Sequence, residues 1–133
     1  MEMTESEFVR AFEDASLPNE SFHHRDHVRL TWIYLRECGE SGARSRLVQG
    51  IQRFAAAKGK AEKYHHTITL AWIRLVEAAR ASAGECDFDA LIAKHPELLD
   101  KTILDRYYSA ELLQSNAARQ GWVEPDKMAL PPS

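Results

Sequence analysis

The sequence predicts an all-α fold, a compact bundle of five to seven helices, from two observations. Apolar residues recur at helical spacing along most of the 133-residue chain. No stretch of useful length shows the alternation of apolar and polar residues that indicates a half-buried strand. A chain of this length can bury one hydrophobic core, so residues 1–120 are expected to form a single helical domain.

The first two helices have recognisable start and stop signals. Thr4 and Glu7 have the spacing of a capping box, and Pro18 marks the end of the first helix. The second helix is expected to begin near residues 23–26 and to end near the Gly-Glu-Ser-Gly segment at 39–42. It is apolar around most of its circumference, which is typical of a helix at the centre of a fold.

The later helices are each marked by a capping residue or a proline at the start. They are expected to begin at Ser41, near 65–67, at Asp87, at Pro96 and at Ser109. Gly59 and Gly84 are the expected ends of the third and fourth helices. Residues 121–133 contain three prolines and are expected to form an extended tail.

Two parts of the chain resemble each other. Residues 30–35 and 70–75 share a Leu-x-Trp-Ile-x-Leu pattern at a spacing of forty residues, and the Phe-His-His at 22–24 matches the Tyr-His-His at 64–66. The pattern indicates two copies of a helical hairpin, followed by further helices. In that arrangement the second and fourth helices would lie at the centre and face each other.

Composition excludes several classes of partner. A net charge of −3 provides no general attraction to nucleic acid or to an anionic membrane. No stretch approaches the roughly 20 apolar residues that a membrane helix needs. The acidic start at residues 1–5 does not resemble a secretory signal, and Cys38 and Cys86 lack C-x-x-C spacing. We therefore expect a cytoplasmic protein that binds neither nucleic acid nor membrane.

Five of the six histidines form two clusters, at the expected starts of the second and fourth helices. His24 and His27 lie on one helical face, and His65 and His66 belong to the other cluster. Three protein ligands with an open fourth position are typical of a catalytic zinc site. The first hypothesis is therefore a histidine-lined site for zinc, iron, manganese or nickel between the two helices. Its ligands would be His24, His27 and one of His65 or His66, with Asp26 as a fourth ligand or an orienting residue. Metal-bound water would then act as the nucleophile of a hydrolase-like enzyme.

The second hypothesis needs no metal. A helix N-terminus carries partial positive charge and free N–H groups, which repel a cation and favour an anion. The same two helix starts have nearby Arg25, Arg29, Lys60, Lys63 and Thr67, with Tyr64 and Thr69 as further ligand-binding candidates. A small organic molecule with a carboxylate or phosphate group would bind there, beside neutral histidines. Trp32 and Trp72 could line such a pocket, although at helical spacing within apolar runs they also fit core positions.

The third hypothesis is a helical interaction module. In this version Tyr107, Tyr108 and Trp122 are exposed and dock onto a partner protein or a second copy of the chain as a homodimer, while the histidines only cap helices. The alternative for the same aromatic residues is that they pack the last helix and the tail onto the bundle.

The two histidine segments also carry a resemblance to a known family. The chain resembles small, uncharacterised bacterial all-helical proteins that have an F-x-H-x-x-H element, a helix and a later Y-H-x-T-x-T element. The matching positions here are Phe22, His24, His27, Tyr64, His65, Thr67 and Thr69. The resemblance implies no activity, substrate or cofactor. It favours His24, His27 and His65 over His23 and His66 as the site residues to test.

Overall fold

The computed structural model describes residues 4–131, and within that range the regular structure is entirely helical, so the predicted all-α fold is confirmed. The α-helices are α1 (Glu5–Glu13), α2 (His24–Ala57), α3 (His66–Ala83), α4 (Phe88–Lys94), α5 (Ala110–Leu113) and α6 (Asn116–Gln120). The 3-10 helices are η1 (Asn19–Ser21), η2 (Ala61–Lys63), η3 (Pro96–Leu99) and η4 (Lys101–Arg106). Residues 1–3, part of the acidic start, and residues 132–133, the end of the proline-containing tail, lie outside the described residues. None of the helices within 4–131 is both long enough and apolar enough to cross a membrane.

The predicted second and third helices are two arms of one bent helix, α2. Gly39 has a φ of 71° and a ψ of 179°, and the residues on either side of it are helical. Glycine adopts a positive φ without the steric penalty that a Cβ brings, so this single residue redirects the chain. The expected break at 39–42 is therefore in the right place. The expected loop and the Ser41 N-cap are wrong, because Ser41 already lies inside the helix.

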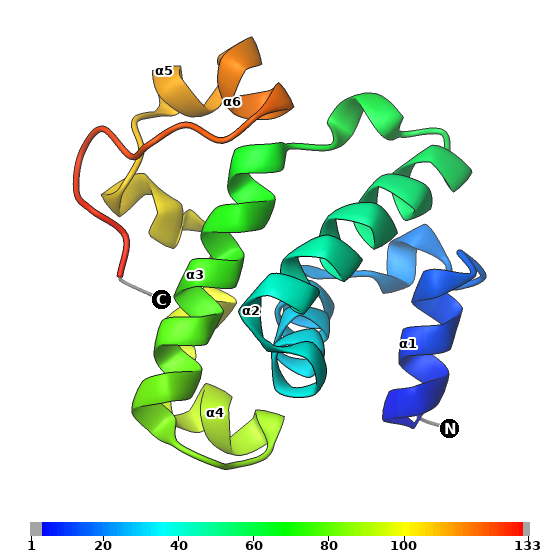
Figure 1. The fold of residues 1–133 in the computed structure, drawn as a ribbon. Helices are drawn as coiled ribbons and strands as arrows, with labels where there is room; N and C mark the ends of the chain where they lie inside the picture. Colours follow the sequence, from blue (N-terminus) through cyan, green and yellow to red (C-terminus); the bar gives the residue numbers. More distant parts are fainter. Residues whose placement is uncertain (1–3, 132–133) are drawn as a thin grey trace.

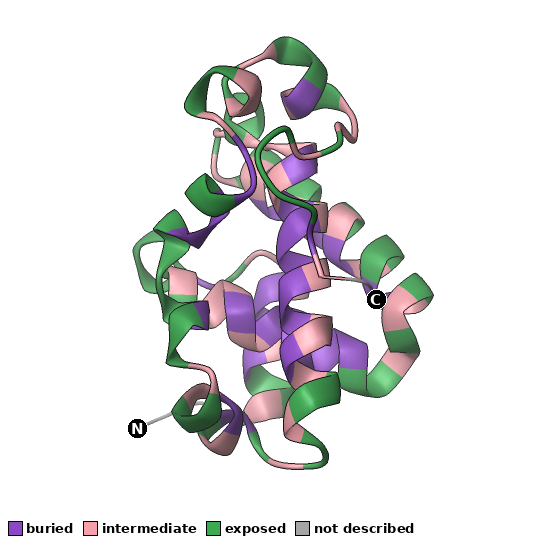
Figure 2. Cartoon of the chain, turned by 90° about the vertical axis from the view of Figure 1, so that its left-hand side faces the viewer, coloured by how far each residue is buried: buried purple, intermediate pink, exposed green. Residues whose placement is uncertain are grey.

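The core lies where α2 and α3 meet (Figure 1). These two helices make the most extensive contact in the fold, while α1 covers α2 and α6 covers the start of α3. Fully buried residues include Ile33 and Leu35 of α2 and Ile73 and Val76 of α3. Figure 2 shows the buried residues gathered along the middle of the molecule, with exposed residues at its periphery. The second and fourth predicted helices are therefore central, as their apolar patterns indicate.

α2 and α3 begin in related ways. His23 and His65, which match in the sequence repeat, are the N-cap residues of these two helices. The His65 side chain accepts a hydrogen bond from the backbone N–H of Ile68, with 3.1 Å between Nδ1 and N. At the start of α2 the backbone N–H of His23 donates to Asp26 Oδ2 at 3.0 Å. The repeat is thus visible at the helix starts, although different groups satisfy the backbone there.

The tail from residue 121 onward forms no helix within the described range, and it packs against the bundle (Figure 1). The Thr67 hydroxyl donates to the carbonyl of Gly121 at 2.7 Å and accepts from the backbone N–H of Val123 at 3.2 Å. Tyr108 donates its hydroxyl proton to the carbonyl of Val123 at 2.9 Å, and Leu130 is buried in the core. These contacts hold the tail against α3 and the segment after η4.

Candidate functional site

The first histidine cluster lies in a partly buried aromatic environment. His24 Nε2 is 2.9 Å from the carbonyl oxygen of Leu98. Because a carbonyl oxygen only accepts hydrogen bonds, this nitrogen carries the ring proton. The His24 ring also lies edge-on to Trp72, with 4.6 Å between centroids, and 6.4 Å from the ring of His27. The His27 ring meets the edge of Phe22 at 6.2 Å.

Burial keeps both of these imidazoles neutral at neutral pH. Burial, with a smaller contribution from the nearby His24, lowers the pKa of His27 to about 4. Burial also lowers the pKa of His24, and its hydrogen bond to Leu98 partly opposes that shift. Neutral imidazole is the form that binds metals or exchanges protons, so these two side chains have the right protonation state for either hypothesis.

The histidine side chains of the second cluster, His65 and His66, form hydrogen bonds within the protein. Besides accepting from Ile68, His65 donates from Nε2 to the carbonyl oxygen of Leu113 at 2.7 Å. Both ring nitrogens of His65 are therefore used, and neither offers a lone pair to a metal in this conformation. His66 Nδ1 is 2.8 Å from the hydroxyl of Tyr64. The histidines of this cluster cap and brace the start of α3.

The structure does not bring the predicted metal ligands together. His24 contacts Trp72, which lies seven residues beyond His65, or roughly 10 Å along α3 at 1.5 Å per residue. Asp26 faces the backbone of His23 through its Oδ2 atom. Between residues 4 and 131, no three His, Cys, Asp or Glu side chains are grouped so that they could hold a metal ion. The divalent-metal site stays a prediction.

All four predicted ligand-binding residues have internal partners, including Arg25, which pairs with Asp89. The Tyr64 hydroxyl forms a hydrogen bond with His66, and the Thr67 hydroxyl donates to the carbonyl of Gly121 in the tail. The Thr69 hydroxyl donates to the carbonyl oxygen of His65 at 2.9 Å, one turn earlier in α3. Only Arg25 lies in a groove.

The exposed aromatic surface expected of an interaction module is not present at the predicted residues. Tyr107 is 8% exposed and Tyr108 is 1% exposed, so the expectation that these two rings are exposed is wrong. Trp122 is partly buried and lies edge-on to Tyr108, with 6.5 Å between the ring centroids. These residues instead hold the tail, because their rings gain more from burial in the bundle than from exposure to water.

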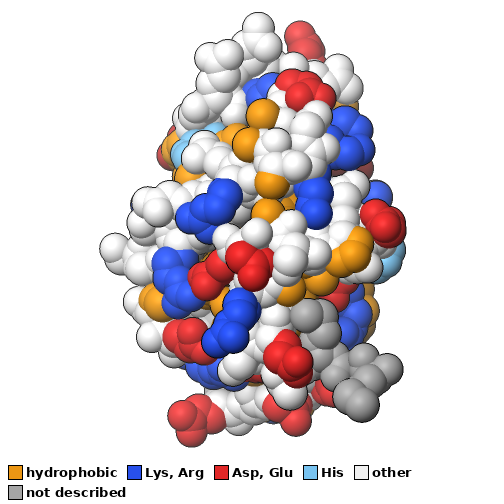
Figure 3. Space-filling model, turned by 90° about the vertical axis from the view of Figure 1, so that its right-hand side faces the viewer, with side chains coloured by type: hydrophobic (Ala, Val, Ile, Leu, Met, Phe, Trp, Pro, Cys, Tyr) orange, Lys and Arg blue, Asp and Glu red, His pale blue; other side chains and the backbone are white. Residues whose placement is uncertain are grey.

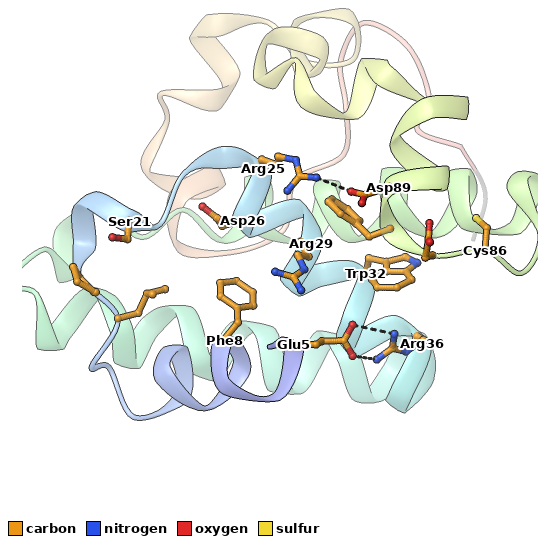
Figure 4. Close-up of a pocket in the computed structure, with 14 residues that line it drawn as sticks. Glu5, Phe8, Ser21, Arg25, Asp26, Arg29, Trp32, Arg36, Cys86 and Asp89 are labelled. Carbon is orange, nitrogen blue, oxygen red and sulfur yellow. Dashed lines mark hydrogen bonds and ion pairs between the residues drawn. The ribbon is translucent and has the colours of Figure 1, made fainter. Parts of the chain in front are cut away.

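A groove of about 730 Å³ lies between α1, η1, α2 and the start of α4 (Figure 4). Its apolar lining includes Phe8, Leu17, Trp32 and Phe88. Its charged lining consists of three arginines, Arg25, Arg29 and Arg36, and four carboxylates, Glu5, Asp26, Asp87 and Asp89. A concave site with an apolar floor and a few charged groups has the general character of a small-molecule site.

The arginines line the groove because of their spacing on α2. Arg25, Arg29, Trp32 and Arg36 follow the i, i+4, i+7, i+11 pattern of one helical face. Each guanidinium group covers an aromatic ring: Arg25 covers Phe88 at 5.0 Å, Arg29 covers Phe8 at 5.2 Å and Arg36 covers Trp32 at 4.7 Å, measured to the ring centroids. Cation–π contacts of this kind hold the guanidinium planes in place.

Two of the three arginines already have an anionic partner. Arg25 pairs with Asp89 at 2.9 Å, and Arg36 pairs with Glu5. The hydrogen bond from Arg36 holds the pKa of the Glu5 carboxyl below its usual range. Arg29 is the exception, because no residue from 4 to 131 forms an ion pair or a hydrogen bond with its guanidinium group. Figure 4 shows it between the two ion pairs, beside Phe8.

The remaining two carboxylates of the groove satisfy backbone groups. Asp26 accepts from the N–H of His23, and Asp87 accepts from the N–H of Ala90 at 2.8 Å. Sequence reasoning placed Arg25, Arg29 and Asp26 near the start of α2, but it did not distinguish Arg29 from the other basic residues there. The spacing of three arginines and a tryptophan on one helical face was the available signal. The rings and carboxylates that surround Arg29 come from α1 and α4, which no local pattern connects to it.

Comparison with known proteins adds no family or function to this picture. No family model, no curated protein and no solved structure matches the chain. The candidate site therefore depends on the geometry and chemistry of the chain's own residues.

Proposed function

We propose that this protein binds a small organic anion in the groove between α1, η1, α2 and α4, and that Arg29 pairs with the anionic group of the ligand. The observation that carries the proposal is the state of Arg29. Its side chain is partly buried and its guanidinium group lies over Phe8. It has no anionic partner among the described residues.

A partly buried, unpaired charge lowers the stability of a fold unless something compensates it. A carboxylate, sulfate or phosphate oxygen pair on a ligand would compensate Arg29, since the planar guanidinium group binds such groups through two parallel hydrogen bonds. The contact with Phe8 orients the guanidinium before the ligand arrives, which reduces the entropy lost on binding.

The dimensions and place of the groove support a small ligand. Its volume of about 730 Å³ falls within the roughly 300–1,000 Å³ that is usual for such sites. Arg25 and Asp26 in the first turn of α2 form part of it, so it borders one of the two helix starts at which an anion was expected. The groove contains none of Tyr64, Thr67 or Thr69.

Calorimetric titration with phenyl sulfate and with benzoate tests the proposal. The Arg29→Gln variant is expected to bind both at least about tenfold more weakly than the unchanged protein, because one charge-assisted pair is lost. Arg44→Gln is the matched control. Arg44 lies in the second arm of α2, outside the groove, and pairs with Glu40 at 3.7 Å.

Arg44→Gln is expected to keep the affinity of the unchanged protein within about twofold. Two results would refute the proposal. One is an equal loss of affinity in both variants, which would indicate a general effect of net charge. The other is the absence of saturable binding of either anion at concentrations on the order of 10 mM.

A further inference from the structure

We infer that the groove selects organic acids with a single negative charge over dianions and polyanions, and that Asp26 is the residue that sets this preference. The inference rests on the proposed function, because it takes Arg29 as the group that binds the anion. It specifies the chemical class of the ligand and adds a specificity-determining residue.

Few of the charges in the groove are available to a ligand. The groove has three guanidinium groups and four carboxylates in its lining. Arg25 forms an ion pair with Asp89, and Arg36 forms one with Glu5, so both guanidinium groups are already paired within the protein. Among the lining residues within 4–131, Arg29 is the cation that forms no ion pair, so a second negative charge on the ligand would meet no unpaired cation there.

Asp26 lies close to Arg29 in the groove. It precedes Arg29 by three residues on α2, which places both side chains on one face of the helix, and both line the groove. Figure 4 shows the two side chains bordering the same open space, with Phe8 on its other side. No ion pair or hydrogen bond joins Asp26 to Arg29 in the described part of the chain, and the Oδ2 atom of Asp26 accepts from the backbone N–H of His23.

A carboxylate fixed in this way repels any anion near Arg29, and the repulsion grows in proportion to the charge of that anion. For a monoanion the attraction to Arg29 opposes the repulsion from Asp26. For a dianion the extra charge increases both, while Asp87 adds a further carboxylate, so that the described lining has four carboxylates and three guanidinium groups. The groove therefore gains little from a second charge, although desolvating it has a large energetic cost.

Part of the groove lining is uncharged and can contact the uncharged portion of a ligand. Leu17, Pro18 and Ser21 are uncharged lining residues in and just before η1. Figure 4 shows Phe8 between Ser21 and Arg29. An uncharged body bound beside Arg29 is therefore accommodated at the η1 end. Figure 3 shows basic and acidic side chains interspersed over the face that carries α1. A surface of this kind has no extended positive field to attract a polyanion.

A pair of probes with one shape and different charges tests the inference. Phenyl sulfate carries one negative charge, and phenyl phosphate at pH 8 carries about two, because its second pKa lies near 6. Benzyl alcohol is the uncharged probe. The proteins to titrate are the unchanged chain, Asp26→Asn, Glu20→Gln and Arg29→Gln.

Asparagine retains a side-chain oxygen for the N–H of His23, so Asp26→Asn removes the charge and keeps the cap. Glu20→Gln removes one charge at an exposed position in η1 that does not line the groove. The unchanged protein is expected to bind phenyl sulfate about tenfold more tightly than phenyl phosphate. Asp26→Asn is expected to reduce that ratio at least about fivefold by strengthening phosphate binding, and Glu20→Gln is expected to leave it unchanged.

Each contrary result has a separate meaning. Phenyl phosphate binding as tightly as phenyl sulfate, with both lost in Arg29→Gln, overturns the charge selection and leaves the proposed function standing. An equal change of the ratio in Asp26→Asn and Glu20→Gln overturns the role of Asp26. Benzyl alcohol binding as tightly as phenyl sulfate, or unchanged binding of both anions to Arg29→Gln, refutes the proposed function and the inference together.

Discussion

Arg29 of α2 lies over the ring of Phe8 in α1, with 5.2 Å between the guanidinium carbon and the ring centroid. Phe8 is 4% exposed, so its ring belongs to the core and is held in place on its other sides. The position of the unpaired cation is therefore set by the packing of α1 onto α2. A change in the core at Phe8 should be detectable as a change in anion binding.

Phe8→Leu tests this connection. Leucine keeps an apolar side chain in the core but removes the aromatic face, so phenyl sulfate should bind about threefold to tenfold more weakly. The free energy of unfolding should fall by roughly 1 kcal/mol. Phe54→Leu is the matched control, because Phe54 is a core phenylalanine (5% exposed) that lies under Lys58 and does not line the groove. The control should lose similar stability in urea unfolding and keep its affinity in calorimetry. Equal losses of affinity would contradict the connection.

The attachment of the tail depends on Thr67. Thr67→Val removes the hydroxyl that bonds both Gly121 and Val123, so we expect a loss of about 1–3 kcal/mol in stability. Hydrogen exchange of the amides in residues 121–131 should accelerate. Thr69→Val is the control, since the Thr69 hydroxyl bonds only a carbonyl of its own chain segment, and its loss should cost less than about 1 kcal/mol. A tail equally protected in both variants would show that Thr67 does not hold it.

His65 distinguishes the capping role from the predicted metal site. His65→Ala removes an N-cap and the bond to Leu113, which should lower stability by about 1–2 kcal/mol. The loss of stability in His65→Ala should be the same in the presence of EDTA as in the presence of added zinc. Zinc that raises the melting temperature of the unchanged protein, and that is retained in elemental analysis but lost from both His24→Ala and His65→Ala, would favour the metal site instead.

His27 should make the fold sensitive to mild acid. Its pKa is lowered from 6.5 to about 4, so below neutral pH the unfolded chain binds the proton first. Stability should therefore be constant above about pH 7 and fall by about 2 kcal/mol between pH 7 and pH 5. His27→Gln should remove most of that decline, measured by urea unfolding at both pH values. His23→Gln, at an exposed position, should retain it. An unchanged decline in His27→Gln would assign the acid sensitivity to other groups.

Much of the fold could be predicted from local patterns. The capping box at Thr4 and Glu7 and the N-caps at Asp87 and Ser109 are present as expected. These signals depend on neighbouring residues alone, which is why sequence spacing reveals them. The prediction at Ser41 was wrong, because Gly39 alone redirects α2 and the chain resumes helical geometry at once.

The site was harder to predict, because its properties arise between distant segments. The histidine pairs suggested shared ligands, and the structure instead uses His65 within its own helix start and against Leu113, forty-eight residues later. The spacing of Arg29 on its helical face does not reveal which groups contact it. Its importance follows from Phe8 beneath it and from the lack of an ion pair or hydrogen bond to its guanidinium group among the described residues, and both depend on how α1 packs on α2.

The most direct test of the central claim is an NMR titration of the protein with phenyl sulfate, following the backbone amides and the arginine Nε–H signals. The account predicts saturable shifts that are largest at the Arg29 Nε–H and at the amides of Phe8, Ser21 and Asp26, with residues 64–69 unaffected. Shifts concentrated at residues 64–69, or shifts that never saturate, would contradict the claim that Arg29 forms the binding site.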